Sequence, residues 1–121
     1  MNSREQLVHQ YMEGFRTSDH QAILACLTAD IVWHIHGVRT TRGKAEFDTE
    51  IENPGFEGSP ELTVDRTIEA GDVIVITGIG VGHHREHGRF RFAYCDLFTF
   101  AGDLIAQIDS YLAPLPADPE E

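Results

Sequence analysis

Apolar residues recur with a helical period in the N-terminal part of the chain. Leu7, Tyr11 and Phe15 are spaced four residues apart. This stripe predicts an amphipathic helix that begins at Ser3. A Ser-x-x-Gln capping pattern then opens a second apolar run, which predicts a short helix over residues 18–27.

The period then changes to that of a β-strand. Residues 30–36 are rich in β-branched and aromatic side chains, and Gly37 ends the run. Alternation separates this strand into two faces, one with Ile31, Trp33 and Ile35 and the other with Val32, His34 and His36. After a polar turn over residues 39–43, residues 44–51 predict a third short helix.

Four strands complete the predicted order, at Glu61–Glu69, Val73–His84, Arg89–Phe100 and Leu104–Leu112. Short connections join them, so successive strands are expected to pair antiparallel. Residues 114–121 are proline-rich and acidic, which predicts a disordered tail. Residues 1–113 are therefore expected to form a single domain.

Three N-terminal helices followed by mainly antiparallel strands predict an α+β fold, with the helices on one side of a curved sheet. A bent sheet closed by helices leaves a blind pocket, which is a common place for a small apolar ligand.

Composition narrows the functional classes. The chain has 121 residues and a net charge of −11, which disfavours binding to nucleic acid or to an anionic membrane surface. No apolar run reaches the roughly 20 residues of a membrane span. The chain has two cysteines outside any CxxC pattern and an N-terminus without a signal-peptide pattern. Together these features predict a cytoplasmic protein.

Three segments in order resemble one superfamily. They are Leu7–Tyr11 with the helix that follows, Thr41–Ala45, and Asp96–Phe100 followed by Gly102–Ile105. Together they resemble the nuclear-transport-factor-2-like superfamily, which includes ketosteroid isomerases and SnoaL-like polyketide cyclases. The resemblance runs from about Leu7 to Tyr111. It implies a cone-shaped, cystatin-like or ketosteroid isomerase-like fold.

The resemblance also implies chemistry. In ketosteroid isomerases an aspartate base moves a proton, while a tyrosine and a protonated aspartic acid bind the developing oxyanion. By resemblance, the oxyanion tyrosine falls on Tyr11 and the oxyanion aspartic acid on Asp96. The base position falls on Ile35, which cannot accept a proton, so only half of the catalytic site carries over.

Asp96 is the most informative polar residue, because it interrupts an aromatic strand face made of Phe90, Phe92, Tyr94, Phe98 and Phe100. Burial among aromatic rings should raise the pKa of Asp96 and suit it to acid–base chemistry. Alternatively, Asp96 pairs with an arginine or a buried hydroxyl. Tyr11 either faces the pocket beside Asp96 or is a core residue with its hydroxyl on a backbone carbonyl.

A histidine could supply the missing base. His34 is next to Ile35 but should face away from it unless a bulge re-aims the strand, and His83 is the second candidate. No metal site is expected, because the histidines lack a characteristic ligand spacing. The pocket is expected to be lined by Phe15, Trp33, Ile35, Phe47, His83, Phe98 and Tyr111.

The sequence thus predicts a cofactor-free isomerase or cyclase that acts on a small apolar carbonyl compound, with Tyr11, Asp96 and His34 as catalytic residues. The alternative is a non-catalytic small-molecule-binding or dimerisation domain of the same fold. By resemblance, a homodimer is expected through the outer face of the sheet. Apolar strand residues predicted to supply that face are Ile74, Ile76, Leu97 and Ile108.

Overall fold

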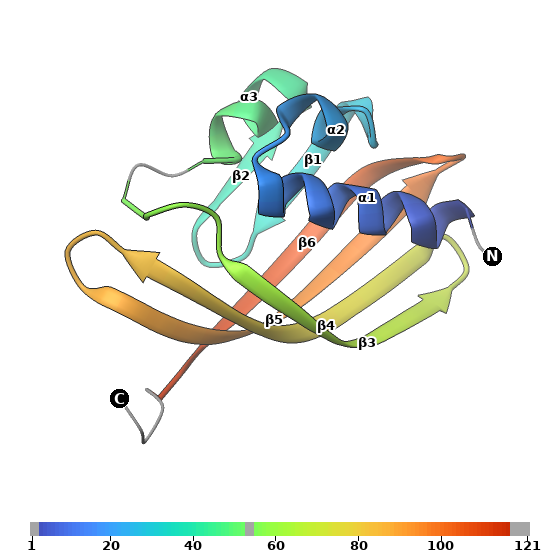
Figure 1. Cartoon of the computed structure of the whole chain (residues 1–121). Coiled ribbons are helices and arrows are strands. Elements are labelled where there is room, and N and C mark those ends of the chain that lie inside the picture. Colours follow the sequence, from blue (N-terminus) through green and yellow to red (C-terminus); the bar gives the residue numbers. More distant parts are fainter. Residues whose placement is uncertain (1–2, 53–54, 117–121) are drawn as a thin grey trace.

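The three helices of the computed structural model all lie on the concave side of a strongly curved sheet (Figure 1). The structure describes residues 3–52 and 55–116. Within these ranges the helices are α1 (Ser3–Thr17), α2 (His20–Leu24) and α3 (Gly43–Glu50). The strands are β1 (Leu27–Ile35), β2 (Arg39–Arg42), β3 (Glu61–Ala70), β4 (Val73–His84), β5 (Gly88–Ala101) and β6 (Leu104–Leu115). None of the helices in these ranges is long and apolar enough to cross a bilayer.

The strand order is β2-β1-β6-β5-β4-β3 across the described part of the chain. Neighbouring strands pair antiparallel except for β1 and β6, which are parallel. The predicted α+β class and the antiparallel order of the last four strands are confirmed. Two features differ from the prediction. Residues 39–42 form a short edge strand instead of a turn, and the first strand begins at Leu27.

Helix α1 is attached to the sheet by its buried stripe and by Arg4. The stripe contains Val8 and Tyr11. The Arg4 guanidinium donates to Asp72 Oδ1 at 3.0 Å and to the carbonyl oxygen of Gly102 at 2.9 Å. These acceptors lie in the β3–β4 and β5–β6 turns, so one side chain fixes the start of α1 against two hairpins.

The N-cap of helix α2 lies one residue later than predicted. The Asp19 carboxylate accepts from the backbone N–H of Ala22 at 3.1 Å, so Asp19 is the N-cap. Ser18 instead has a left-handed backbone, with φ of 55°. It supplies the sharp turn between α1 and α2.

Inward-facing glycines on β4 shape the concave face. Gly78, Gly80 and Gly82 lie directly opposite Tyr94, Phe92 and Phe90 on β5. Each aromatic side chain reaches across the space that a β4 side chain would fill. The aromatic residues of β5 therefore cover β4 instead of standing upright over their own strand.

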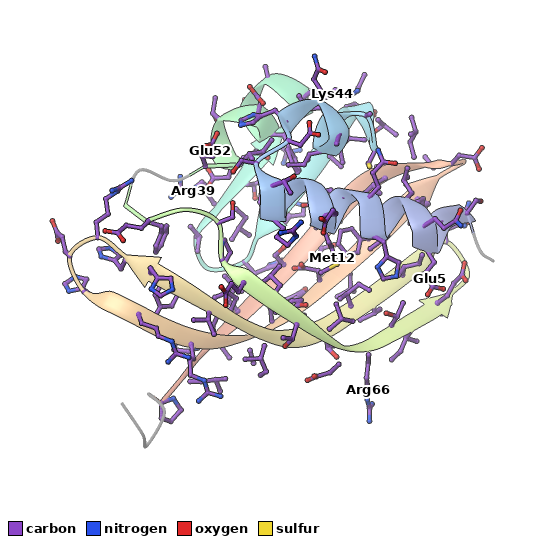
Figure 2. All side chains as sticks on the ribbon, in the orientation of Figure 1. Glu5, Met12, Arg39, Lys44, Glu52 and Arg66 are labelled. Carbon is purple, nitrogen blue, oxygen red and sulfur yellow. The ribbon has the colours of Figure 1, made fainter. Side chains whose placement is uncertain are left out.

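Three of the four residues predicted to lie on the outer face of the sheet lie on its inner face instead. Ile74, Ile76 and Ile108 are at most 1% exposed and lie in the core beneath the helices. The pairing register explains this, since Ile76 lies opposite Asp96 and therefore shares its inward face. Leu97, the next residue along β5, lies on the outer face. Arg66 also projects from this face, away from the helices (Figure 2).

The C-terminal strand is longer than predicted. Pro114 pairs with Phe92 and Leu115 with Arg91, so the first two residues of the predicted tail belong to β6. Residues 117–121, which make up most of that tail, lie outside the described residues.

Candidate functional site

Asp96 and Tyr11 come together on the concave side of the sheet. Asp96 lies on β5 between the inward-facing Tyr94 and Phe98. Tyr11 projects from α1, is 5% exposed and packs edge-on against Phe98 with ring centroids 5.3 Å apart. Burial raises the pKa of Tyr11 well above its usual range, and the negative charge of Asp96 raises it further. The Tyr11 phenol therefore stays protonated and can donate a hydrogen bond.

The carboxyl group of Asp96 has the most informative titration in the site. Burial raises the pKa of Asp96 to about 6, although a hydrogen bond with the Ser110 side chain opposes this effect. Asp96 keeps a partly exposed surface. A carboxyl group with this pKa can both take up and release a proton near neutral pH.

Ser110 links Asp96 to Trp33. It lies directly opposite Asp96 in the β5–β6 register and is 6% exposed. Its Oγ accepts a hydrogen bond of 2.9 Å from Trp33 Nε1. Three neighbouring strands, β1, β6 and β5, thus each contribute one polar group to a connected row beneath the helices.

Aromatic rings enclose Tyr11. Phe15 lies 5.0 Å and Phe47 6.2 Å from it between ring centroids, and Trp33 stacks on Phe47 at 4.8 Å. The structure therefore brings Phe15, Trp33, Phe47 and Phe98 together around Tyr11. Ile35 follows Trp33 on the inner face of β1. That these residues line a ligand pocket remains a prediction.

A cleft of about 190 Å³ opens beside this cluster, between α1 and β3. Met12 lies there between the helix and the sheet (Figure 2). Phe15 lines the cleft and also contacts Tyr11. Tyr11 and Asp96 are not among its lining residues, which are His9, Met12, Glu13, Phe15, Arg16, Pro60, Leu62 and Val64.

Three predicted site residues lie away from Tyr11 and Asp96. His34 and Tyr111 face the outer side of the sheet, where His34 Nδ1 is 2.9 Å from Thr40 Oγ1 and Tyr111 is 46% exposed. The irregularity in β1 lies between Leu27 and Val32, so it does not re-aim His34.

His83 is exposed beyond the glycine-rich part of β4, where its backbone oxygen accepts from Glu57. Strand alternation is the reason for all three placements. The expectations that Tyr111 and His83 line the pocket and that His34 supplies the base are corrected accordingly.

The outer face carries a polar cluster of its own. His36 Nε2 lies 2.9 Å from Asp109 Oδ1, and the His36 ring stacks on Tyr111 at 4.3 Å. Burial alone would raise the pKa of Asp109, but hydrogen bonds with His36 and Gln107 lower it overall. Within the described ranges, no three or more His, Cys, Asp or Glu residues are grouped to hold a metal ion.

Ser110 was missed from the sequence. A serine within an apolar strand carries little signal by itself. Its spacing of two from Ile108 nevertheless places it on the inner face, where a small polar residue usually has a buried partner.

Comparison with known proteins agrees with this architecture. A nuclear-transport-factor-2-like protein of unknown function from Burkholderia pseudomallei superposes with a TM-score of 0.84 at 20% identity, covering 92% of this chain and 91% of that one. TerC, co-crystallised with polyporic acid, gives 0.81 at 18%, covering 91% of each chain. An LEH-like epoxide hydrolase from M. tuberculosis gives 0.78 at 17%, covering 91% and 82%. These likenesses establish a shared fold.

The search of curated proteins finds no match. The sequence profile of the SnoaL-like domain family, however, matches residues 8–108, from α1 to β6. The superfamily resemblance and the ketosteroid isomerase-like fold are thereby confirmed. The chain belongs to the SnoaL-like domain family.

Proposed function

We propose that this protein is a cofactor-free isomerase or cyclase that moves a proton on a small apolar carbonyl compound. The observation that carries the proposal is the inward-facing carboxyl of Asp96, whose pKa of about 6 suits proton transfer. Tyr11 lies beside it with a phenol that stays protonated. An acid–base group and a hydrogen-bond donor are the two components that enolisation of a ketone requires.

In the proposed reaction the substrate carbonyl oxygen accepts a hydrogen bond from Tyr11. The Asp96 carboxylate takes a proton from the carbon next to the carbonyl, and the C–H electron pair moves to form the enolate. Where the substrate has a C=C bond next to the deprotonated carbon, the enolate is a dienolate. Protonated Asp96 then gives the proton to the far carbon of the dienolate, the carbonyl re-forms and the double bond moves by one position, which completes an isomerisation. Phe15 separates the α1–β3 cleft from Tyr11, so the ligand is proposed to enter by displacing this ring.

The proposal is tested by hydrogen exchange, which does not require the natural substrate. A panel of small apolar ketones is incubated with the protein in D₂O, and deuterium uptake at the carbon next to the carbonyl is followed by NMR. Asp96→Asn should lower the exchange rate by roughly 100-fold or more, and Tyr11→Phe by roughly 100-fold. The matched control is Asp109→Asn on the outer face, which should leave exchange unchanged.

The alternative is ligand binding without turnover. Two observations favour it: Tyr11 is 5% exposed, and Ile35 occupies the position where the resemblance places a base. Ketones that bind, as seen by ligand-observed NMR, but never exchange faster than in buffer would support this alternative over the enzyme.

We propose in addition that two copies pair through the outer face of the sheet. Partly exposed apolar residues on this face, such as Val75, Ile79, Val81 and Leu97, support this proposal. Isologous homodimers are the commonest oligomers.

A further inference from the structure

The hydrogen bond between Trp33 and Ser110 has a defined direction. An indole N–H can only donate, so the Ser110 Oγ must be the acceptor of the 2.9 Å bond. A hydroxyl that accepts in this way still has its own hydrogen to donate. Trp33 therefore fixes one side of the Ser110 hydroxyl and leaves its hydrogen for a different partner.

Asp96 is that partner. It lies directly opposite Ser110 on the neighbouring strand, on the same inward face. The hydrogen bond between them lowers the pKa of Asp96 against the effect of burial. Because the Ser110 Oγ accepts from Trp33, its hydroxyl hydrogen is left to donate to this carboxylate, and such a bond stabilises the charged form of Asp96.

Among the described residues, the other groups near Asp96 are apolar, donate to a different acceptor or have a different proposed role. On β4 the residue opposite Asp96 is Ile76. On its own strand Tyr94 donates its hydroxyl to the carbonyl oxygen of Thr63 at 2.7 Å, and Cys95 points to the outer face. From the helices, Tyr11 is the titratable group near Asp96, and it is the residue proposed to bind the substrate oxygen.

We propose that Trp33 and Ser110 are positioning residues that hold Asp96 as a hydrogen-bond acceptor, so that Asp96 is the base of the site. This inference rests on the proposed function. The resemblance implies a protonated aspartic acid that donates a hydrogen bond to the oxyanion. In this proposal Asp96 is instead an ionised carboxylate that accepts a hydrogen bond. The base lost at Ile35 is thereby replaced from β5, and Tyr11 remains as the donor to the substrate oxygen.

The test is the titration of Asp96, followed through its ¹³C carboxyl resonance by NMR. Ser110→Ala should move the midpoint upward by roughly one pH unit, because burial then acts unopposed. Ser110→Thr keeps the hydroxyl and should restore the wild-type midpoint. Trp33→Phe removes the indole donor and should give a smaller upward shift. Amide spectra of each variant establish that the fold is retained.

An unchanged midpoint in folded Ser110→Ala would overturn the proposal, and a downward shift would show that Ser110 accepts from a protonated Asp96 instead. These outcomes are separate from the fate of the proposed function. Absence of ketone exchange in the wild type, with the Ser110→Ala shift present, would reject catalysis and keep the positioning role. Exchange that depends on Asp96, with no shift in Ser110→Ala, would reject the positioning role and keep catalysis.

Discussion

The ring of Phe92 occupies the space into which a side chain at Gly80 would extend. A Cβ atom built on Gly80 would lie 2.2 Å from Phe92 Cζ, and one on Gly82 would lie 2.5 Å from Phe90 Cζ. At Gly78 the nearest atom is different, because a Cβ there would lie 1.8 Å from the backbone oxygen of Thr63. All three positions on β4 therefore require glycine because a neighbouring atom lies too close for a Cβ atom. At Gly80 and Gly82 this neighbour is an aromatic ring, and at Gly78 it is the backbone of β3.

This difference predicts unequal effects of adding one methyl group. Gly78→Ala should lower the free energy of unfolding by roughly 3 kcal/mol, because the backbone of β3 must move. Gly80→Ala should cost roughly 1 kcal/mol, because the Phe92 ring can rotate away. Urea unfolding monitored by Trp33 fluorescence measures both values. Equal losses would show that the Phe92 ring is as immobile as the β3 backbone.

A second prediction concerns the charge of Asp96. Its pKa is higher in the folded protein than in the unfolded chain, so the folded state binds the proton more tightly. Stability should therefore fall as the pH rises from about 4 through 6, by roughly 3 kcal/mol in total. Asp96→Asn should remove this loss. Compared with the wild-type protein, the variant should have the same free energy of unfolding at pH 4 and a higher one at pH 8. Asp103→Asn, in the exposed β5–β6 turn, is the matched control. A wild-type pH profile retained in Asp96→Asn would contradict the titration described for Asp96.

A third prediction concerns His20, which joins α2 to α3. Its Nδ1 lies 2.6 Å from Asp48 Oδ1 and its Nε2 lies 2.5 Å from Glu52 Oε1. Hydrogen bonds to these carboxylates, with Asp48 the larger influence, raise the pKa of His20. The resulting stability is fully present below the usual histidine pKa and is lost as the pH rises through the raised value. The loss should stay below about 1 kcal/mol, because the pair is largely exposed to solvent.

The contribution of His20 is best measured in the Asp96→Asn background, where the Asp96 titration is absent. There, His20→Gln should flatten the remaining fall in stability above pH 6.5. Asp48→Asn removes the main partner of His20 and should also reduce this fall in stability with pH. A slope that survives both substitutions would have to come from another group.

A fourth prediction tests the outer face as a dimer interface. Leu97→Glu places a charge among the partly exposed apolar residues of this face and should convert a dimer to a monomer, as measured by light scattering during size-exclusion chromatography. Val38→Glu is the control, because Val38 is 59% exposed in the β1–β2 turn. A monomeric wild-type protein would reject the proposed pairing directly.

Element order was predictable because each segment has a clear period or a clear end. The alternation of β5 correctly put Asp96 on one face with the aromatic residues, and the structure brings it to Tyr11. Strand β4 was harder, because Val73 to Ile76 are apolar at every position and alternation cannot tell the inner from the outer face. The prediction that Ile74 and Ile76 lie on the outer face is wrong for this reason.

The remaining errors have a common origin in long-range pairing. The edge strand β2 is exposed except at Thr41, so its sequence resembles a turn. The link from Trp33 to Ser110 depends on β1 lying beside β6, which no local pattern specifies. The alternation of β1 predicts that His34 faces away from Ile35. The structure has His34 in that orientation, so His34 is not positioned to act as the base.

The parallel pairing of β1 with β6 also determines when the site can form during synthesis. Trp33 lies on β1 and Ser110 lies on β6, 77 positions later in the sequence. The ribosome therefore synthesises β2, β3, β4 and β5 between these two residues. A nascent chain can form the hairpins of β3, β4 and β5 early, because those contacts are local. Strand β1 cannot pair with β6 until β6 has left the ribosome. The Asp96 site therefore depends on a contact between residues 77 positions apart, and such non-local contacts form more slowly than local hairpins.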